Sequence, residues 1–167
     1  MSIRLPNGAH SMSDTHNVFM PHRHEDDHFV QKLKAELQAR GVNVRDASIT
    51  SDKPNRAKSP EYIRSQILAP GIRNAGKIIV IVTPDTANHQ WVDWEVEYAA
   101  RYPDKKIIGV WAPGSDGCPI PAELEKHGHD VVTWDIDKII DSMNGDSHWE
   151  RPDGTPREAP AMSRIGC

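Results

Sequence analysis

Long apolar runs are missing from this sequence of 167 residues, and hydrophobic residues make up only 37% of it. No stretch approaches the roughly 18–20 apolar residues that cross a bilayer, so we expect neither a spanning helix nor a membrane partner. The opening letters, MSIRLPNGAHSMSD, lack an apolar centre, and no signal peptide is expected. Globular domains usually contain roughly 45–50% apolar residues, with Gly included. The shortfall indicates either loose packing throughout or a normal domain with polar tails.

Cysteines are also few, and basic residues are outnumbered by acidic ones. The two cysteines, Cys118 and Cys167, provide neither a disulfide framework nor a zinc set. A reduced, cytoplasmic location is therefore the expectation. Lys and Arg number 20 against 24 Asp and Glu, which gives a net charge of −4. Because nucleic-acid surfaces are usually basic, this balance argues against a nucleic-acid partner.

Polar composition is concentrated at the two ends of the chain. Residues 1–15 are expected to be a disordered tail or a remnant of expression. Residues 145–167 contain three prolines and no periodicity, so we predict a disordered or loosely docked tail. Trp149 is the one side chain there that we expect to pack on the domain. A single domain is predicted over 16–144, which is long enough for a core of its own.

Strand and helix patterns alternate between the tails. KIIVIV and KIIGVW are apolar on both faces, as central strands of a parallel sheet are. The alternation predicts an α/β fold, and five strands in about 130 residues indicate a flavodoxin-like three-layer sandwich with strand order 2-1-3-4-5. The predicted strands are 17–20, 42–45, 77–82, 106–111 and 131–134. The predicted helices are 26–40, one from 59 that the Pro-Gly pair at 70–71 kinks or ends before Gly76, 88–102, 121–127 and 135–143.

The strand order fixes where a ligand is expected. Such sheets bind ligands beyond the carboxyl ends of their strands, at the switch point between strands one and three. Residues 21–24, after the first strand, and 83–91, after the third, are therefore expected to line the site. The ends of strands two and four, near 46–48 and 112–115, are expected to flank it.

One acid in the helix after the third strand has an unusual position. On a helical wheel its Trp, Val, Tyr and Ala residues form one apolar arc, and Glu95 falls in the middle of that arc. Asp93 and Glu97 fall on the solvent side. An inward carboxylate is costly unless it is paired or functional. A salt-bridged or rim carboxylate is the ordinary explanation, but this helix begins at the predicted crevice, which favours a functional Glu95 beside Trp91.

The segment HRHEDDH, residues 22–28, invites a metal-binding interpretation, because imidazoles spaced by one residue do occur as zinc ligands. Asp27 stands where the metallo-β-lactamase pattern needs a His, and acids suit the start of the following helix. We therefore expect no metal site there. No dinucleotide or P-loop glycine pattern is present. Cys118 has no obvious paired base and is expected to be a solvated loop thiol.

Several segments resemble a known family. NVFMPHRHEDD, the strand KIIVIVTP and the helix start WVDWE resemble Toll/interleukin-1 receptor (TIR) domains. More narrowly, residues 16–143 are similar to the bacterial TIR-like proteins of Thoeris anti-phage systems, to which VRDASITSDKPN, YIRSQI and KIIGVWAPG also correspond. The W-x-x-x-E spacing alone is a weak signal, and it becomes fairly specific in this order of segments.

The resemblance implies an enzyme. TIR domains of this kind cleave the nicotinamide–ribose bond of NAD as NAD nucleosidases or ADP-ribosyl cyclases. Thoeris proteins release or cyclise ADP-ribose as a signal for a downstream effector in antiviral defence. The catalytic Glu lies four residues after the Trp, which corresponds here to Glu95. NAD is then the substrate, and no cofactor is expected. TIR–TIR contacts imply a homo-oligomer.

The resemblance also implies substrate-binding positions. In the family, the turn after strand one and the loop after strand two contact the substrate. Arg23 is expected to contact the negatively charged pyrophosphate, and Trp91 is expected to stack on nicotinamide or adenine. The turn carries Met20-Pro21-His22 where many TIR domains have a small hydroxyl residue, so the chain departs from the family there. The substrate-binding residues expected are Pro21, His22, Arg23, Asp46, Ser48 and Trp91.

Two other functions remain open at this point. A non-catalytic TIR module would act by homotypic association, with the long loop at 46–58 as its interaction surface. A nucleoside base–sugar transferase would share the general architecture and also use a Glu.

Overall fold

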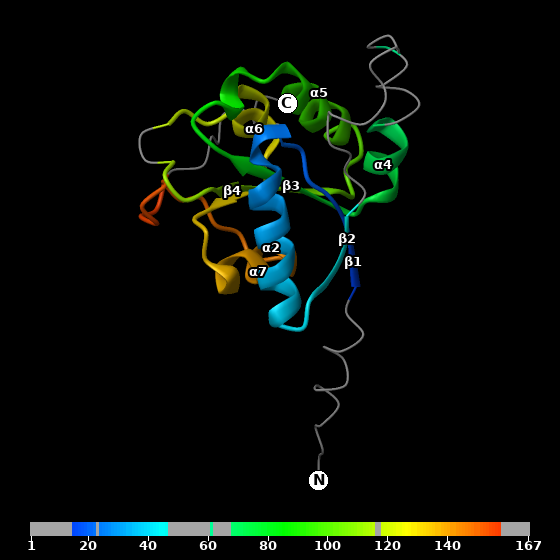
Figure 1. Ribbon diagram of the computed structural model, residues 1–167. Helices are drawn as coiled ribbons and strands as arrows, with labels where there is room; N and C mark the ends of the chain where they lie inside the picture. The colour runs from blue at the N-terminus through cyan, green and yellow to red at the C-terminus, as the bar shows by residue number, and fades with distance from the viewer. Residues whose placement is uncertain (1–14, 23, 47–60, 62–67, 116–117, 158–167) are drawn as a thin grey trace.

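The computed structural model describes residues 15–22, 24–46, 61, 68–115 and 118–157, apart from the side chains of His24, Asp46 and Asn88. Helices and strands alternate along the chain (Figure 1). The strands are β1 (Thr15–Phe19), β2 (Asn43–Asp46), β3 (Lys77–Val82), β4 (Lys106–Trp111) and β5 (Asp130–Val132). The α-helices are α2 (Asp27–Ala39), α4 (Ala69–Asn74), α5 (Gln90–Ala99), α6 (Ala122–His127) and α7 (Ile136–Met143), and two 3₁₀ turns are η1 (His24–Asp26) and η3 (Thr86–Asn88).

The strands form one parallel sheet in the order β2-β1-β3-β4-β5, which confirms the predicted fold class and strand order. β3 and β4 pair along their whole lengths, from Lys77 opposite Lys106 to Val82 opposite Trp111. β1 pairs only with the start of β3, and its last residue, Phe19, lies opposite Ile78. β3 therefore continues beyond the end of β1. The switch point of the sheet lies between these two strands, at the end of β1.

Helices cover both faces of the sheet, with α2 and α7 on one face and α4, α5 and α6 on the other (Figure 1). The side chains of β3 alternate between the two layers. Ile79 and Ile81 pack under α2 and α7, whereas Ile78, Val80 and Val82 pack under α4 and α5. All five are fully buried, and each burial of this kind contributes roughly 1.5–3 kcal/mol. This two-sided burial explains why every residue of β3 after Lys77 is apolar.

Element boundaries differ from the predictions by a few residues. The first strand starts at Thr15 and ends at Phe19 rather than spanning 17–20. α5 is shorter than the predicted 88–102 because the 3₁₀ turn η3 precedes it. The Pro-Gly pair at 70–71 lies in α4, which ends before Gly76 as predicted. α4 continues to Asn74, with the proline in the first turn, where no N–H is needed. The predicted helix start at 59 lies outside the described residues.

The chain after α7 packs against the edge of the sheet. Trp149 bridges to Val131, and its indole N–H donates to the His129 carbonyl over 2.9 Å, in agreement with the expectation for this side chain. Glu150 is only 7% exposed and was not singled out by the sequence. Its carbonyl accepts a hydrogen bond from the Trp111 indole over 2.8 Å. Packing therefore continues beyond residue 144, the predicted end of the domain.

None of the helices that the structure describes is long and apolar enough to cross a membrane.

Candidate functional site

A buried polar network joins the turn after β1 to the turn after β3. The Thr83 hydroxyl donates to the Asp26 carboxylate over 3.0 Å, and the Thr83 backbone N–H donates to the Thr86 hydroxyl over 2.8 Å. The Thr86 hydroxyl also lies 3.3 Å from the Ile81 carbonyl. Asp26, Thr83 and Thr86 are all less than 5% exposed. Because buried polar groups are costly without partners, this network fixes both walls of the switch point.

The first predicted substrate-binding residues lie where the sequence placed them, directly after β1. Pro21 is buried, and the His22 side chain is only 2% exposed. The ring Nδ1 of His22 lies 2.6 Å from the Met20 carbonyl, and its Nε2 lies 3.1 Å from the Asp27 carboxylate. Both ring nitrogens are thus engaged within the turn, so His22 ties the turn to the start of α2.

The remaining positions of the two expected loops are only partly described. Arg23 and Ser48 lie outside the described residues. Asp46 is the last residue of β2 and lies opposite Val18, but its side chain is not among those described. Substrate contacts by these three residues therefore stay predictions.

Glu95 points into the protein, as the helical wheel predicts. It lies on α5, is 6% exposed, and shares the buried side of the helix with Val92, Val96 and Ala99. Among the described residues no hydrogen bond or ion pair reaches its carboxylate. Burial raises the pKa of Glu95 to about 8, because the ionised form loses its hydration. A buried carboxylate whose pKa is perturbed in this way is typical of functional sites.

Trp91 lies one helical turn before Glu95 and is half-buried. Residues four apart lie on the same helix face, about 5–6 Å apart at Cβ, so the aromatic side chain accompanies the carboxylate as predicted. Further along the helix, Trp94 and Tyr98 stack with their ring centroids 5.1 Å apart. Both rings, like that of Trp91, pack against the core layer under α5, and neither belongs to the predicted substrate-binding residues.

The prediction for Asp93 is wrong. Its side chain was expected in solvent, but it is half-buried, and its Oδ1 is fully buried. Burial, and then the charge of Glu123, raises the pKa of Asp93, while the Glu123 backbone N–H bonds to it. The reason is that α6 packs against this side of α5, a contact that a wheel of α5 alone cannot reveal.

Two open grooves lie near the carboxyl end of β4, and Trp111 and Pro152 contribute to the lining of both. One, of about 420 Å³, is lined in part by Ser115 and Trp134. The other, of about 370 Å³, is lined in part by Cys118 and Arg157. Neither includes Glu95. Most of the loop expected to flank Glu95, residues 47–60, lies outside the described residues, so the candidate site is defined here by α5 and by the two linked turns.

Metal-ligating side chains of the described residues come together at one place, which is not the HRHEDDH segment. Asp141, Asp146 and His148 form this group. It adjoins Lys106 and Asp130, the first residues of β4 and β5, and therefore lies at the opposite edge of the sheet from the candidate site.

The part of the chain that contains the switch point and Glu95 is similar to known proteins. A family model described as "Thoeris protein ThsB, TIR-like domain" matches residues 19–116, which include the turn after β1, β3, Trp91 and Glu95. No curated protein sequence matches the chain. Among solved structures, a 2-deoxyribosyltransferase from Bacillus psychrosaccharolyticus has a TM-score of 0.50 and 16% identity, covering 74% of this chain and 89% of that chain. The TIR domains of the activated Roq1 resistosome have a TM-score of 0.42 and 16% identity, covering 78% and 71%. At this identity the likeness to the transferase is one of fold.

Proposed function

The chain belongs to the TIR-like family of the Thoeris protein ThsB, and from that premise we propose that it cleaves the nicotinamide–ribose bond of NAD with Glu95 as the catalytic carboxylate. The observation that carries the proposal is the burial of Glu95 on the inner side of α5, with no partner among the described residues. A carboxylate held in this way is costly to the fold. Glu95 lies one helical turn after Trp91 on α5, which supports a role in binding and cleaving the substrate.

Cleavage of the nicotinamide–ribose bond requires a group that stabilises positive charge, and a carboxylate such as Glu95 can do so. Breaking the C–N bond of NAD sends the bonding electron pair to nicotinamide, which leaves neutral, and an oxocarbenium-like ribose remains. A nearby carboxylate stabilises that positive charge. With a pKa of about 8, Glu95 is mostly protonated at neutral pH in the empty site. A bound nicotinamide cation favours the ionised form, so the negative charge would develop when the substrate binds.

The other predicted residues complete the proposed site. Trp91 would stack on nicotinamide or adenine, and Arg23 would neutralise pyrophosphate charge. Asp46 and Ser48 would flank the ribose from the end of β2. Pro21 and His22 would form the wall after β1, where the contact between His22 and Asp27 holds the turn in place.

Chromatography of NAD incubated with purified protein, with mass identification of the products, tests the proposal. Wild-type protein is expected to release nicotinamide, and Glu95→Gln is expected to lose this activity by at least a hundredfold. Glu97→Gln is the matched control, because Glu97 lies on the same helix but is exposed. Sustained cleavage by Glu95→Gln would overturn the site assignment.

The two alternatives give different results in the same assay. A nucleoside base–sugar transferase is suggested by the fold shared with the 2-deoxyribosyltransferase, and it would exchange bases on nucleosides while leaving NAD intact. A non-catalytic module would leave both substrates intact, also when clustered, and substitutions in the loop at 46–58 would abolish its self-association.

The family also motivates a biological role. We propose that the ADP-ribose-derived product, linear or cyclic, is a signal for a downstream effector in prokaryotic antiviral defence, and that TIR–TIR contacts make the active form a homo-oligomer. Sedimentation of wild-type protein during NAD turnover measures the assembly. Full activity of a strictly monomeric species would contradict the oligomer proposal while leaving the cleavage proposal intact.

A further inference from the structure

The C-terminal end of α7 brings two carboxylates together. The Asp146 backbone N–H donates to the Asp141 carbonyl over 3.0 Å, and the Gly145 N–H donates to the Ser142 carbonyl over 3.2 Å. Together these bonds form a Schellman motif. Gly145 has φ +118°, a value that a side chain would rarely allow. The motif therefore folds Asp146 back over the last turn of the helix.

The two acids are unusual in these positions. The residues that occupy them in a Schellman motif frequently make an apolar contact, whereas here both are aspartates. Negative charge is also unfavourable at a helix C-terminus, where the helix dipole is already negative. The nearby Lys106 forms an ion pair with neither of these two carboxylates. Its Nζ donates to the backbone carbonyls of Ser142 and Asp146 over 2.5 and 2.9 Å, and it pairs with Asp130 over 3.0 Å. The carboxylates of Asp141 and Asp146 thus lack a cation among the described residues.

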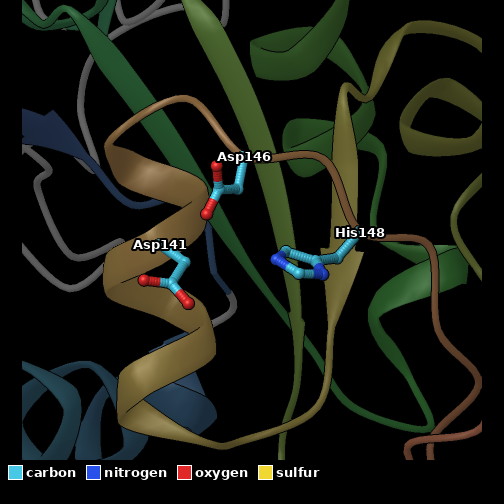
Figure 2. A group of neighbouring side chains, drawn as sticks. All are labelled: Asp141, Asp146 and His148. Atoms are coloured by element: carbon cyan, nitrogen blue, oxygen red, sulfur yellow. The ribbon is translucent and has the colours of Figure 1, made fainter.

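An imidazole from another segment faces this pair. His148 is held beside β5, where its carbonyl accepts a hydrogen bond from the Val131 N–H over 2.8 Å. Figure 2 shows its ring directed towards Asp141 and Asp146. The Nε2 of His148 is fully buried and has no hydrogen-bond partner within the described chain. An unsatisfied buried polar atom costs about 1–3 kcal/mol, which is an independent indication that a ligand belongs there.

We propose that Asp141, Asp146 and His148 bind one divalent transition-metal ion of the Zn²⁺ or Mn²⁺ type. One ligand atom from each residue lies within 4.8 Å of the others. Metal–ligand bonds of about 2.0–2.2 Å in tetrahedral geometry place two ligand atoms roughly 3.3–3.6 Å apart. Both aspartates are exposed, and rotation of their side chains would bring the ligand atoms to this spacing. One imidazole and two carboxylates favour these metals over Ca²⁺ and Mg²⁺, which prefer oxygen alone.

The position of the site assigns the ion a structural role. It lies at the amino edge of the sheet, away from Glu95, and joins the end of α7 to the segment that carries Trp149 and Glu150. Bound metal would therefore clamp this C-terminal segment onto the domain. The inference is independent of NAD cleavage, since no predicted substrate-binding residue takes part.

Calorimetric titration of the full chain with ZnCl₂, after removal of metal by a chelator, tests the proposal. Wild-type protein is expected to bind one Zn²⁺ that His148→Gln and Asp146→Asn lose or bind at least tenfold more weakly. His28→Gln and Asp104→Asn are matched controls, because both residues are exposed and lie outside the group. Absence of Zn²⁺ binding by wild-type protein, or equal binding by the site variants, would overturn the proposal.

Two further measurements locate the ion and distinguish loss of metal binding from misfolding of a variant. Paramagnetic Mn²⁺ is expected to broaden the NMR signals of the His148 ring and the Trp149 indole before other resonances. Zn²⁺ is expected to raise the melting temperature of wild-type and control proteins by several degrees, and not that of His148→Gln. Broadening centred on another histidine would assign the metal elsewhere and contradict the site.

Discussion

The hydroxyl of Thr83 donates a 3.0 Å hydrogen bond to the carboxylate of Asp26, across the switch point of the sheet. Asp26 directly precedes α2 but makes no side-chain capping bond there. Its carboxylate instead reaches the end of β3, where Thr86 completes the network. The two turns that frame the candidate site are therefore connected within the protein itself.

Thr83→Val tests this connection. Valine has nearly the shape of threonine but leaves the Asp26 carboxylate without one buried donor, so the free energy of unfolding should fall by about 1–3 kcal/mol. Denaturant unfolding measures the change. Thr15→Val, at an exposed position of β1, is the control and should alter stability little. Equal stability of Thr83→Val and wild-type protein would show that the bond does not hold the turns.

Glu95 should destabilise the folded protein at alkaline pH. Its folded pKa of about 8 lies above the ordinary value of 4.5, so between these values the folded state binds more protons than the unfolded state. Stability then falls as pH rises. Glu95→Gln removes this cost and should increase the free energy of unfolding by on the order of 4 kcal/mol at pH 8, and by roughly 1 kcal/mol at pH 5. Glu97→Gln should show no such pH dependence, and a parallel shift in both variants would contradict the burial of Glu95.

Local sequence patterns predict the sheet and the direction of Glu95 because both depend on periodicity within one element. KIIVIV is apolar because both of its faces are covered, and the position of Glu95 follows from the helical repeat of α5. Contacts between distant segments leave no such pattern. Asp93 is half-buried only because α6 packs over it, and the partner of Asp26 lies 57 residues away.

The C-terminal segment is a second case in which contacts between distant residues could not be predicted from local sequence patterns. Its prolines and polar residues suggest a loose tail, yet Glu150 is buried through contacts with β4, β5 and α7. The proposed metal ligand His148 lies in this segment. Only the Schellman turn of α7 and the path along β5 place it beside Asp141 and Asp146.

Glu150 should stabilise the docked segment in a pH-dependent way. Burial opposes its ionisation, but the hydrogen bonds from Lys138, at 2.8 Å, and from Thr133 hold the pKa of Glu150 below 4.5. The stabilisation is therefore present above pH 4.5 and is lost as pH falls through the lowered folded pKa. Glu150→Gln should reduce the free energy of unfolding by about 1–2 kcal/mol at pH 7, and the difference should shrink below pH 4. An unchanged difference at low pH would assign the effect to packing rather than to charge.

Gly109 should be required by the packing of α6 on β4. A Cβ at this position would lie 2.6 Å from a δ-methyl of Leu124, a side chain that is itself fully buried. Gly109→Ala should therefore lower the free energy of unfolding by about 1–3 kcal/mol through overpacking. Leu124→Ala alone should cost about 2–5 kcal/mol by opening a cavity. In the double variant the new methyl occupies part of that cavity, so the loss should be smaller than the sum of the two single losses. Denaturant unfolding of the four proteins measures this coupling. Simple additivity would mean that the cost of Gly109→Ala does not arise from contact with Leu124, which would contradict the packing explanation.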